Sequence, residues 1–152
     1  MTLSEFARDV WLHDSGINAW TFDPERQRLV VSIDSAEPEQ PATQHIKYVK
    51  NANLECVIEF AGVRQLVMNP QVCLDNIAEI KDFDVSPDNS GFRIGIILYD
   101  GAWVEVTGFA ESVSFTPLGY TIGKCDEYLD KDGNPVGRIE SHILHTKIHP
   151  KN

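Results

Sequence analysis

The chain is poor in basic residues. Its 152 residues include 13 Lys+Arg against 23 Asp+Glu, which gives a formal net charge of −10. Nucleic-acid affinity depends largely on cations that neutralise phosphates, so this balance argues against a nucleic-acid binder and also disfavours anionic membrane surfaces. A Gly-rich phosphate loop is absent as well. We therefore expect neither a nucleic acid nor a membrane as a partner.

Cysteines are few. The three in the sequence, Cys56, Cys73 and Cys125, are widely spaced and form no C-x-x-C pair. An odd count without such a pair argues against a disulfide framework and a zinc knuckle. The N-terminal residues have no basic start and no apolar signal-peptide core, and the longest apolar stretch, at 94–99, is too short to span a bilayer. We expect a cytoplasmic protein with reduced thiols.

The sequence has the apolar share of an ordinary globular domain, 42%, and a length that suits a single domain over residues 1–152. A helical period predicts a short helix over Leu3 to Leu12, capped by Thr2 or Ser4. Beyond it the apolar period becomes two, which is typical of half-buried strands. The strands expected from this pattern are 17–22, 28–34, 53–60, 63–68, 77–85, 92–99 and 102–109.

Residues typical of turns and helix caps separate these predicted strands. Asp100-Gly101 between two apolar runs predicts a hairpin with a type I′ turn. Asn69-Pro70 resembles a helix start and predicts a short helix over 70–76. Residues 35–51 read as a long exposed loop whose end, 45–49, is an alternative edge strand. A last hairpin is expected from 120–129 and 136–148, joined by a turn at 130–135.

Together these segments predict an α+β domain dominated by an antiparallel sheet. Consecutive hairpins do not provide the crossovers that a parallel sheet needs. The sequence therefore predicts a curled sheet or a sandwich of seven to nine strands, with one or two short helices.

The C-terminal histidines His142, His145 and His149 are the first candidate for chemistry. On a helix their spacing would place all three on one face, as a zinc site requires. On a strand, His142 would point away from the other two. Because the segment follows a hairpin and is rich in isoleucine, we favour an edge strand and predict no metal, cofactor or catalytic residue.

Two other motifs are better explained by structure than by chemistry. The run Asp130, Asp132, Asn134 resembles a calcium loop, but Pro135 stands where that loop needs glycine and Ser141 where it needs glutamate. A hairpin turn is the simpler interpretation.

The contiguous residues 13–15, His-Asp-Ser, lack the separated arrangement of a catalytic triad. They suit a turn in which side chains bind nearby backbone N–H groups.

Acidic residues gather in two stretches, 75–88 and 126–132. A solvated face is one interpretation, and an electrostatic surface for a basic protein is the sharper one. The contacts that we would test first are Asp82, Asp84, Asp126, Glu127 and Asp130.

Two segments also carry a resemblance. Residues 12–17 (LHDSGI), followed by Phe22-Asp23 and the strand at 28–33, resemble the opening of a group of small bacterial proteins in which a His-Asp-Ser turn precedes a β-hairpin. Residues 58–66 (IEFAGVRQL) look like the same group. Some of its members are immunity proteins of polymorphic-toxin systems, which bind and neutralise a toxin. The resemblance implies a β-rich domain and an immunity-like role.

The sequence therefore predicts a non-enzymatic cytoplasmic protein that binds a basic partner through an acidic surface. The alternative is a small metal-dependent hydrolase with His142 and His145, joined by His13, as ligands. A third reading is a homodimer that pairs through a sheet edge.

Overall fold

A computed structural model describes residues 1–10, 12–35, 53–74, 78–122, 127–132, 134–141 and 146–150. One short helix, α1 (Leu3–Asp9), precedes the strands. These are β1 (Ser15–Asp23), β2 (Arg28–Ser35), β3 (Asn53–Ala61), β4 (Leu66–Asn69), β5 (Ala78–Val85), β6 (Gly91–Ile97), β7 (Trp103–Phe109), β8 (Ser112–Ile122), β9 (Glu127–Asp130), β10 (Pro135–Ser141) and β11 (Thr146–Pro150). No helix in these ranges has the length and apolar character needed to cross a membrane.

The strands form one sheet in the order β11-β10-β9-β8-β3-β2-β1-β5-β6-β7-β4, and its strand pairs are antiparallel. The α+β, mostly antiparallel class predicted from the sequence is confirmed. In the part of the chain that the structure describes, the sheet has 11 strands, against the seven to nine expected. The edge strands β4 and β11 are the candidates for the homodimer contact, which stays a prediction.

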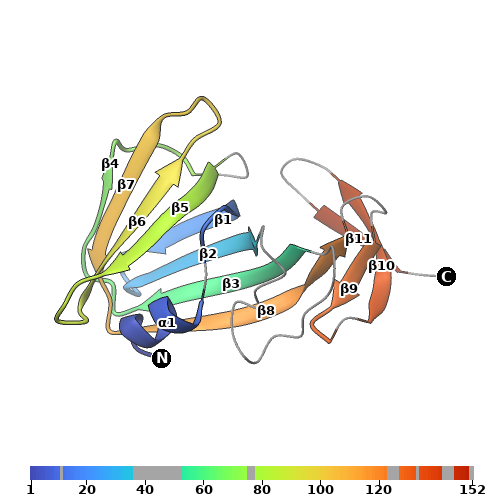
Figure 1. Cartoon of the computed structure of the whole chain (residues 1–152), viewed down its shortest axis with the longest axis horizontal. Helices are drawn as coiled ribbons and strands as arrows, with labels where there is room; N and C mark the ends of the chain where they lie inside the picture. The colour runs from blue at the N-terminus through green and yellow to red at the C-terminus, as the bar shows by residue number, and fades with distance from the viewer. Residues whose placement is uncertain are drawn as a thin grey trace.

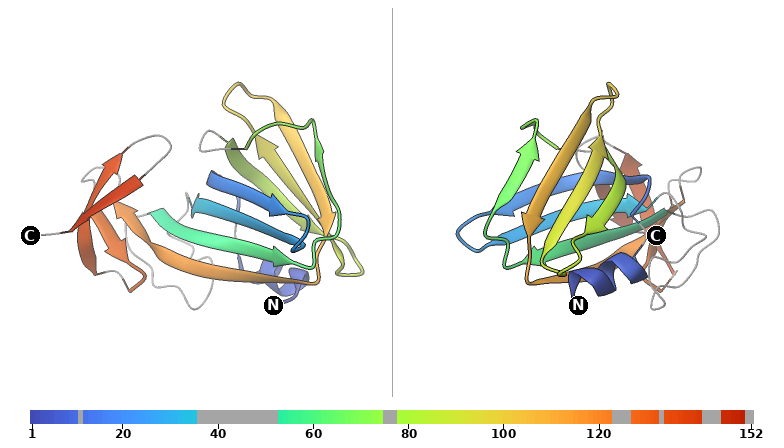
Figure 2. Two further views of the ribbon diagram at one scale, coloured as in Figure 1. Left: turned by 180° about the vertical axis from the view of Figure 1, so that it is seen from behind. Right: turned by 60° about the vertical axis from the view of Figure 1, so that its left-hand side comes forward.

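The sheet bends between β1 and β5. Only the start of β1 pairs with β5, from Ser15 opposite Ile80 to Ile17 opposite Ala78, and β1 is bulged directly after Ile17. Beyond this short contact the two strands diverge, as expected where a bulge increases local twist. Figures 1 and 2 show the result: the wall β5-β6-β7-β4 stands over the wall β1-β2-β3-β8.

The core lies between these two walls. Alternate residues of the upper wall, including Ile94, Ile96 and Val106, face alternate residues of the lower wall, including Val31 and Ile58, and all five are buried. On β7 buried residues alternate fully with more exposed ones, as a strand with one face in the core requires. On β6 Gly95 is also buried, between Ile94 and Ile96. The opposite face of the β5-β6-β7-β4 wall points away from the core; we call it the outer face.

Helix α1 covers one end of the space between the walls (Figure 2). Thr2 and Glu5 form a capping box at its start, and the helix ends at Asp9 rather than at the predicted Leu12. Phe6 is fully buried and packs edge-on against Phe60 and Phe83, with ring centroids 6.0 and 5.3 Å apart. The helix therefore serves as an apolar plug for the core.

Two local predictions are wrong. Of the helix predicted over 70–76, residues 70–74 are not helical but form an irregular segment after β4, and residues 75 and 76 lie outside the described residues. The Asn69–Pro70 bond is cis. The Asp100-Gly101 turn is not type I′: only Gly101 has positive φ, 85°, and its N–H donates to Leu98 O at 2.9 Å. Leu98 N–H in turn donates to Ala102 O. This is a type I turn followed by a glycine bulge, the usual three-residue hairpin loop.

The C-terminal strands are shorter than predicted. The expected strand at 120–129 is divided between β8 and β9, which pair with each other, and the expected strand at 136–148 is divided between β10 and β11. The turn between β9 and β10 is confirmed, because Pro135 lies opposite Leu129. Of the loop predicted over 35–51, Ser35 instead ends β2, and residues 36–51, with the alternative edge strand at 45–49, lie outside the described residues.

Candidate functional site

The outer face carries charged and aromatic side chains from β5, β6 and β7. Along β7 the residues pointing outward are Trp103, Glu105, Thr107 and Phe109, while the alternate residues of that strand are buried. Arg93 is the outward-pointing neighbour on β6, where it lies opposite Asp84 and Thr107. The period of two therefore collects on one surface residues that are distant in sequence.

Arg93 is at the centre of a carboxylate cluster. Its Nη2 lies 2.7 Å from Asp84 Oδ2 and 3.0 Å from Asp82 Oδ1, and its Nη1 lies 3.5 Å from Glu105 Oε2. The hydrogen bonds that Arg93 donates to Asp84, foremost, and to Asp82 raise the pKa of Arg93 above its ordinary value. One guanidinium therefore meets three carboxylates, and the cluster stays negative.

A second ion-pair group lies beside it. Lys81 Nζ binds Asp14 Oδ1 at 2.5 Å and Glu79 Oε2 at 3.1 Å, while His13 Nδ1 lies 3.1 Å from Asp14 Oδ2. The hydrogen bond from Lys81 is the main reason that the pKa of Asp14 is lowered. Asp14 has positive φ, 62°, and its N–H donates to Ile80 O.

The turn predicted at residues 13–15 is therefore confirmed, but its side chains act differently from the prediction. The Asp14 carboxylate pairs with Lys81 on β5 instead of binding nearby backbone N–H groups. Ser15 is fully buried, and within the described part of the chain its hydroxyl has no hydrogen-bond partner. The turn connects α1 to β1 and binds β5 through Asp14. Its three residues do not form a catalytic arrangement.

Gly95 creates a close approach on the outer face. A Cβ atom at this position would lie 2.2 Å from Asp82 Oδ1 and 2.5 Å from Trp103 Cζ2. The carboxylate and the indole ring therefore converge over the glycine, and a larger residue would push them apart. Trp103 nevertheless remains 46% exposed.

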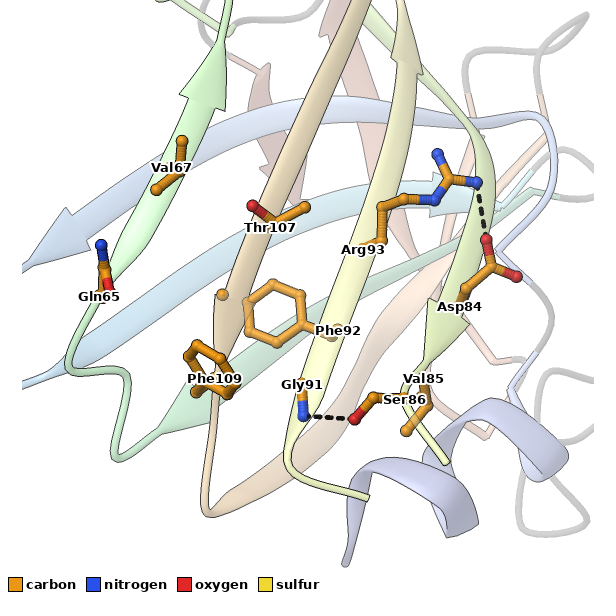
Figure 3. A pocket seen from close by; sticks show the side chains of 11 residues that line it. Gln65, Val67, Asp84, Val85, Ser86, Gly91, Phe92, Arg93, Thr107 and Phe109 are labelled. Carbon is orange, nitrogen blue, oxygen red and sulfur yellow. Dashed lines mark hydrogen bonds and ion pairs between the residues drawn. The ribbon is translucent and has the colours of Figure 1, made fainter. Parts of the chain in front are cut away.

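At the other end of the outer face is a cleft of about 500 Å³, which we call the outer cleft. Figure 3 shows Val67, Thr107 and Phe109 around it, with Arg93 reaching across to Asp84. Phe109 is 55% and Val67 47% exposed. The face thus combines exposed apolar groups at both ends with negative charge between them.

Of the predicted acidic contacts whose side chains are described, Asp130 lies far in the sheet from Asp82 and Asp84. Asp82 and Asp84 are brought together by Arg93 on the outer face. Asp130 lies in the β9–β10 turn, on strands separated from β5 by four others in the sheet order. Its Oδ1 accepts hydrogen bonds from the N–H groups of Asp132 and Asn134, which stabilise the turn. Asp126 lies outside the described residues, and Glu127 begins β9.

The described ranges contain no group of three or more His, Cys, Asp or Glu that would hold a metal ion. His142 and His145 lie outside those ranges, and His149 lies in β11. The metal-dependent hydrolase reading therefore stays a prediction. The third ligand suggested for it, His13, is paired with Asp14 next to the cationic Lys81.

Comparisons with known proteins add no functional assignment. No protein-family model matches the chain, and no curated protein or solved structure is significantly similar to it.

Sequence reasoning missed Arg93, Glu105 and Trp103. The signal for them was in the predicted hairpin of 92–99 and 102–109, whose alternation already places the odd-numbered residues of both strands on one face. What the pattern did not contain was the side-by-side pairing of β5 with β6, which brings Asp82 and Asp84 to that face.

Proposed function

We propose that this chain is a non-enzymatic, cytoplasmic protein-binding domain that docks a basic partner protein on the outer face of β5, β6, β7 and β4. The observation that carries the proposal is the cluster of Asp82, Asp84 and Glu105 around Arg93, bordered by exposed Trp103 and Phe109. Exposed aromatic side chains are enriched in protein interfaces, and complementary charge orients docking.

Charge complementarity supports a basic partner. Within the two ion-pair groups along β5, five carboxylates face the guanidinium of Arg93, the ammonium of Lys81 and the imidazole of His13. The excess negative charge attracts and orients a cationic surface. The Debye length is about 8 Å at physiological ionic strength, so this attraction acts at short range and weakens when salt is added.

The outer cleft supplies the apolar part of such an interface. Interface cores need desolvated apolar contact, and exposed Phe109 and Val67 provide it on either side of the cleft. The acidic cluster provides the orientation. The contacts proposed from the sequence at Asp82 and Asp84 are kept in this account, and Glu105 joins them.

Binding of short peptides with matched length and increasing positive charge tests the proposal. Affinity should rise with positive charge and fall when salt is added. Asp84→Lys and Glu105→Lys should each weaken binding, whereas Glu25→Lys, in the β1–β2 turn, is the matched control and should not. Equal weakening by all three variants, or no binding of basic peptides, would contradict the proposal.

A narrower form of the proposal concerns the partner's nature. The resemblance at residues 12–33 and 58–66 supports an immunity-like role, in which the basic partner is a toxin. Purified chain should then abolish the toxic activity of the partner at equimolar ratio, and Asp84→Lys should restore it. If the partner is bound but keeps its toxic activity, the proposed binding function stands and the immunity role is contradicted.

A further inference from the structure

The positions of Asp82 and Trp103 over Gly95 indicate which kind of side chain the outer face recognises. We propose that Trp103 and Asp82, with Glu105 beside them, form a subsite for one arginine or lysine side chain of the partner. This inference rests on the proposed function, since it names the group that the acidic face selects. The subsite is at the end of the outer face opposite the outer cleft.

The first argument is the geometry above the glycine. The atoms nearest to the missing Cβ of Gly95 are Asp82 Oδ1 and the Cζ2 and Cη2 atoms of Trp103, at 2.2, 2.5 and 2.8 Å. The six-membered part of the indole and the carboxylate therefore both lie directly over Gly95. A cation next to this ring also lies next to a full negative charge.

The second argument is that the groups remain accessible. Trp103 is 46% exposed, and the side chains of Asp82 and Glu105 are 42% and 47% exposed. Glu105 lies directly opposite Gly95 across the β6–β7 pair, so it flanks the same point from the other side. An incoming side chain would meet an aromatic ring and two carboxylates without any rearrangement of the sheet.

The third argument concerns the charge already present. Arg93 engages Asp82 through Oδ1 and leaves Oδ2 with no hydrogen bond among the described residues. The guanidinium of Arg93 repels a second cation, but it carries only one positive charge against the three negative charges of Asp82, Asp84 and Glu105. Cations bind over tryptophan faces more strongly than over other aromatic side chains. The subsite therefore favours a cation over a neutral side chain of the same shape.

The test compares an arginine-containing peptide with the same peptide carrying citrulline, a neutral isostere, at that position. Wild type should prefer the arginine peptide. Trp103→Leu, which keeps apolar bulk and the net charge, should reduce this preference by about two- to fivefold. Gly95→Ala should do the same by separating Trp103 from Asp82. Tyr99→Ala, which removes an exposed aromatic at the β6–β7 hairpin tip, is the control and should leave the preference unchanged.

The outcomes separate this inference from the proposed function. If Asp84→Lys weakens binding but Trp103→Leu keeps the wild-type preference for arginine, the subsite is wrong and the acidic docking face stands. If no basic peptide binds, both are wrong. Should Gly95→Ala not fold, Trp103→Leu still decides the matter, because this exposed residue makes no contribution to the core.

Discussion

Arg93 and Asp84 face each other across the β5–β6 pair, with Nη2 of the arginine 2.7 Å from Oδ2 of the aspartate. The same nitrogen also binds Asp82, and the neighbouring nitrogen binds Glu105. The guanidinium therefore holds the outer face together electrostatically while leaving it negative. Its removal should have opposite effects on stability and on binding.

Arg93→Gln should lower the free energy of unfolding and strengthen binding of a basic peptide. The three carboxylates lose their shared cation and repel one another, at a cost of about 1 kcal/mol for a largely solvated network. Urea unfolding at low and high salt measures the first effect, which should shrink as salt screens the repulsion. Weaker peptide binding by Arg93→Gln would show that Arg93 itself contacts the partner.

Asp34 should contribute less to stability at neutral pH than in acid, below the ordinary pKa of aspartate. Burial raises the pKa of its carboxyl above the ordinary value, even though a hydrogen bond from Asn18 lowers it. The folded state therefore binds the proton more tightly than the unfolded state does. The favourable contribution is present below the ordinary pKa and is lost as pH rises through the folded pKa.

Asp34→Asn should accordingly raise the free energy of unfolding at neutral pH, by about 1 kcal/mol, because a buried unpaired carboxylate oxygen is replaced by a neutral group. The gain should disappear in acid. Asp88→Asn is the opposite control. Hydrogen bonds from Ser86 and Ser90 lower the pKa of Asp88, so its loss should destabilise at neutral pH and have no effect in acid. If the free energies of unfolding of the two variants, each relative to wild type, changed with pH in the same direction, the opposite pKa shifts assigned to Asp34 and Asp88 would be contradicted.

Phe6→Ala should remove most of the anchoring of α1. The ring is fully buried against Phe60 and Phe83, and deletion of such a ring costs about 3–5 kcal/mol. Phe109→Ala removes a ring of the same size from the exposed outer face and should change stability by less than about 0.5 kcal/mol. Similar losses in both variants would mean that the helix is not a plug for the core.

The two described cysteines should differ in reactivity. Cys73 is exposed, whereas Cys56 is buried in the core, and burial strongly raises the pKa of its thiol. Because the thiolate is the reactive form, Cys73→Ser should lower the fast-reacting thiol count of the folded protein by a single equivalent and Cys56→Ser should not change it. Fast labelling of Cys56 in the native state would show that β3 opens.

The sequence was sufficient to predict most strands, because short runs rich in apolar residues, bounded by turn residues, became strands with buried side chains. Ile94 and Val106 are examples: they belong to the two apolar runs of the predicted hairpin, and both are buried. The Asn69-Pro70 signal failed because a local helix start competes with the pairing of β4 against β7, in which Asn69 lies opposite Glu105. Tertiary pairing overrode the local preference.

The site was only half predictable for a related reason. Asp82 and Asp84 were chosen on charge density alone, and the same criterion chose Asp130, whose carboxylate is occupied within its own turn. Local sequence cannot show which carboxylates converge, because convergence depends on strand order. Arg93 and Glu105 join Asp82 and Asp84 only once β5, β6 and β7 lie side by side.

The most direct test of the outer face as a docking surface is a titration of isotope-labelled protein with a basic peptide, followed by amide chemical shifts in NMR spectra. The account predicts saturable shifts concentrated in β5, β6 and β7, around Asp84, Arg93 and Glu105, and their loss in Asp84→Lys. Shifts concentrated instead at the β9–β10 turn around Asp130, or spread evenly over the chain, would contradict it.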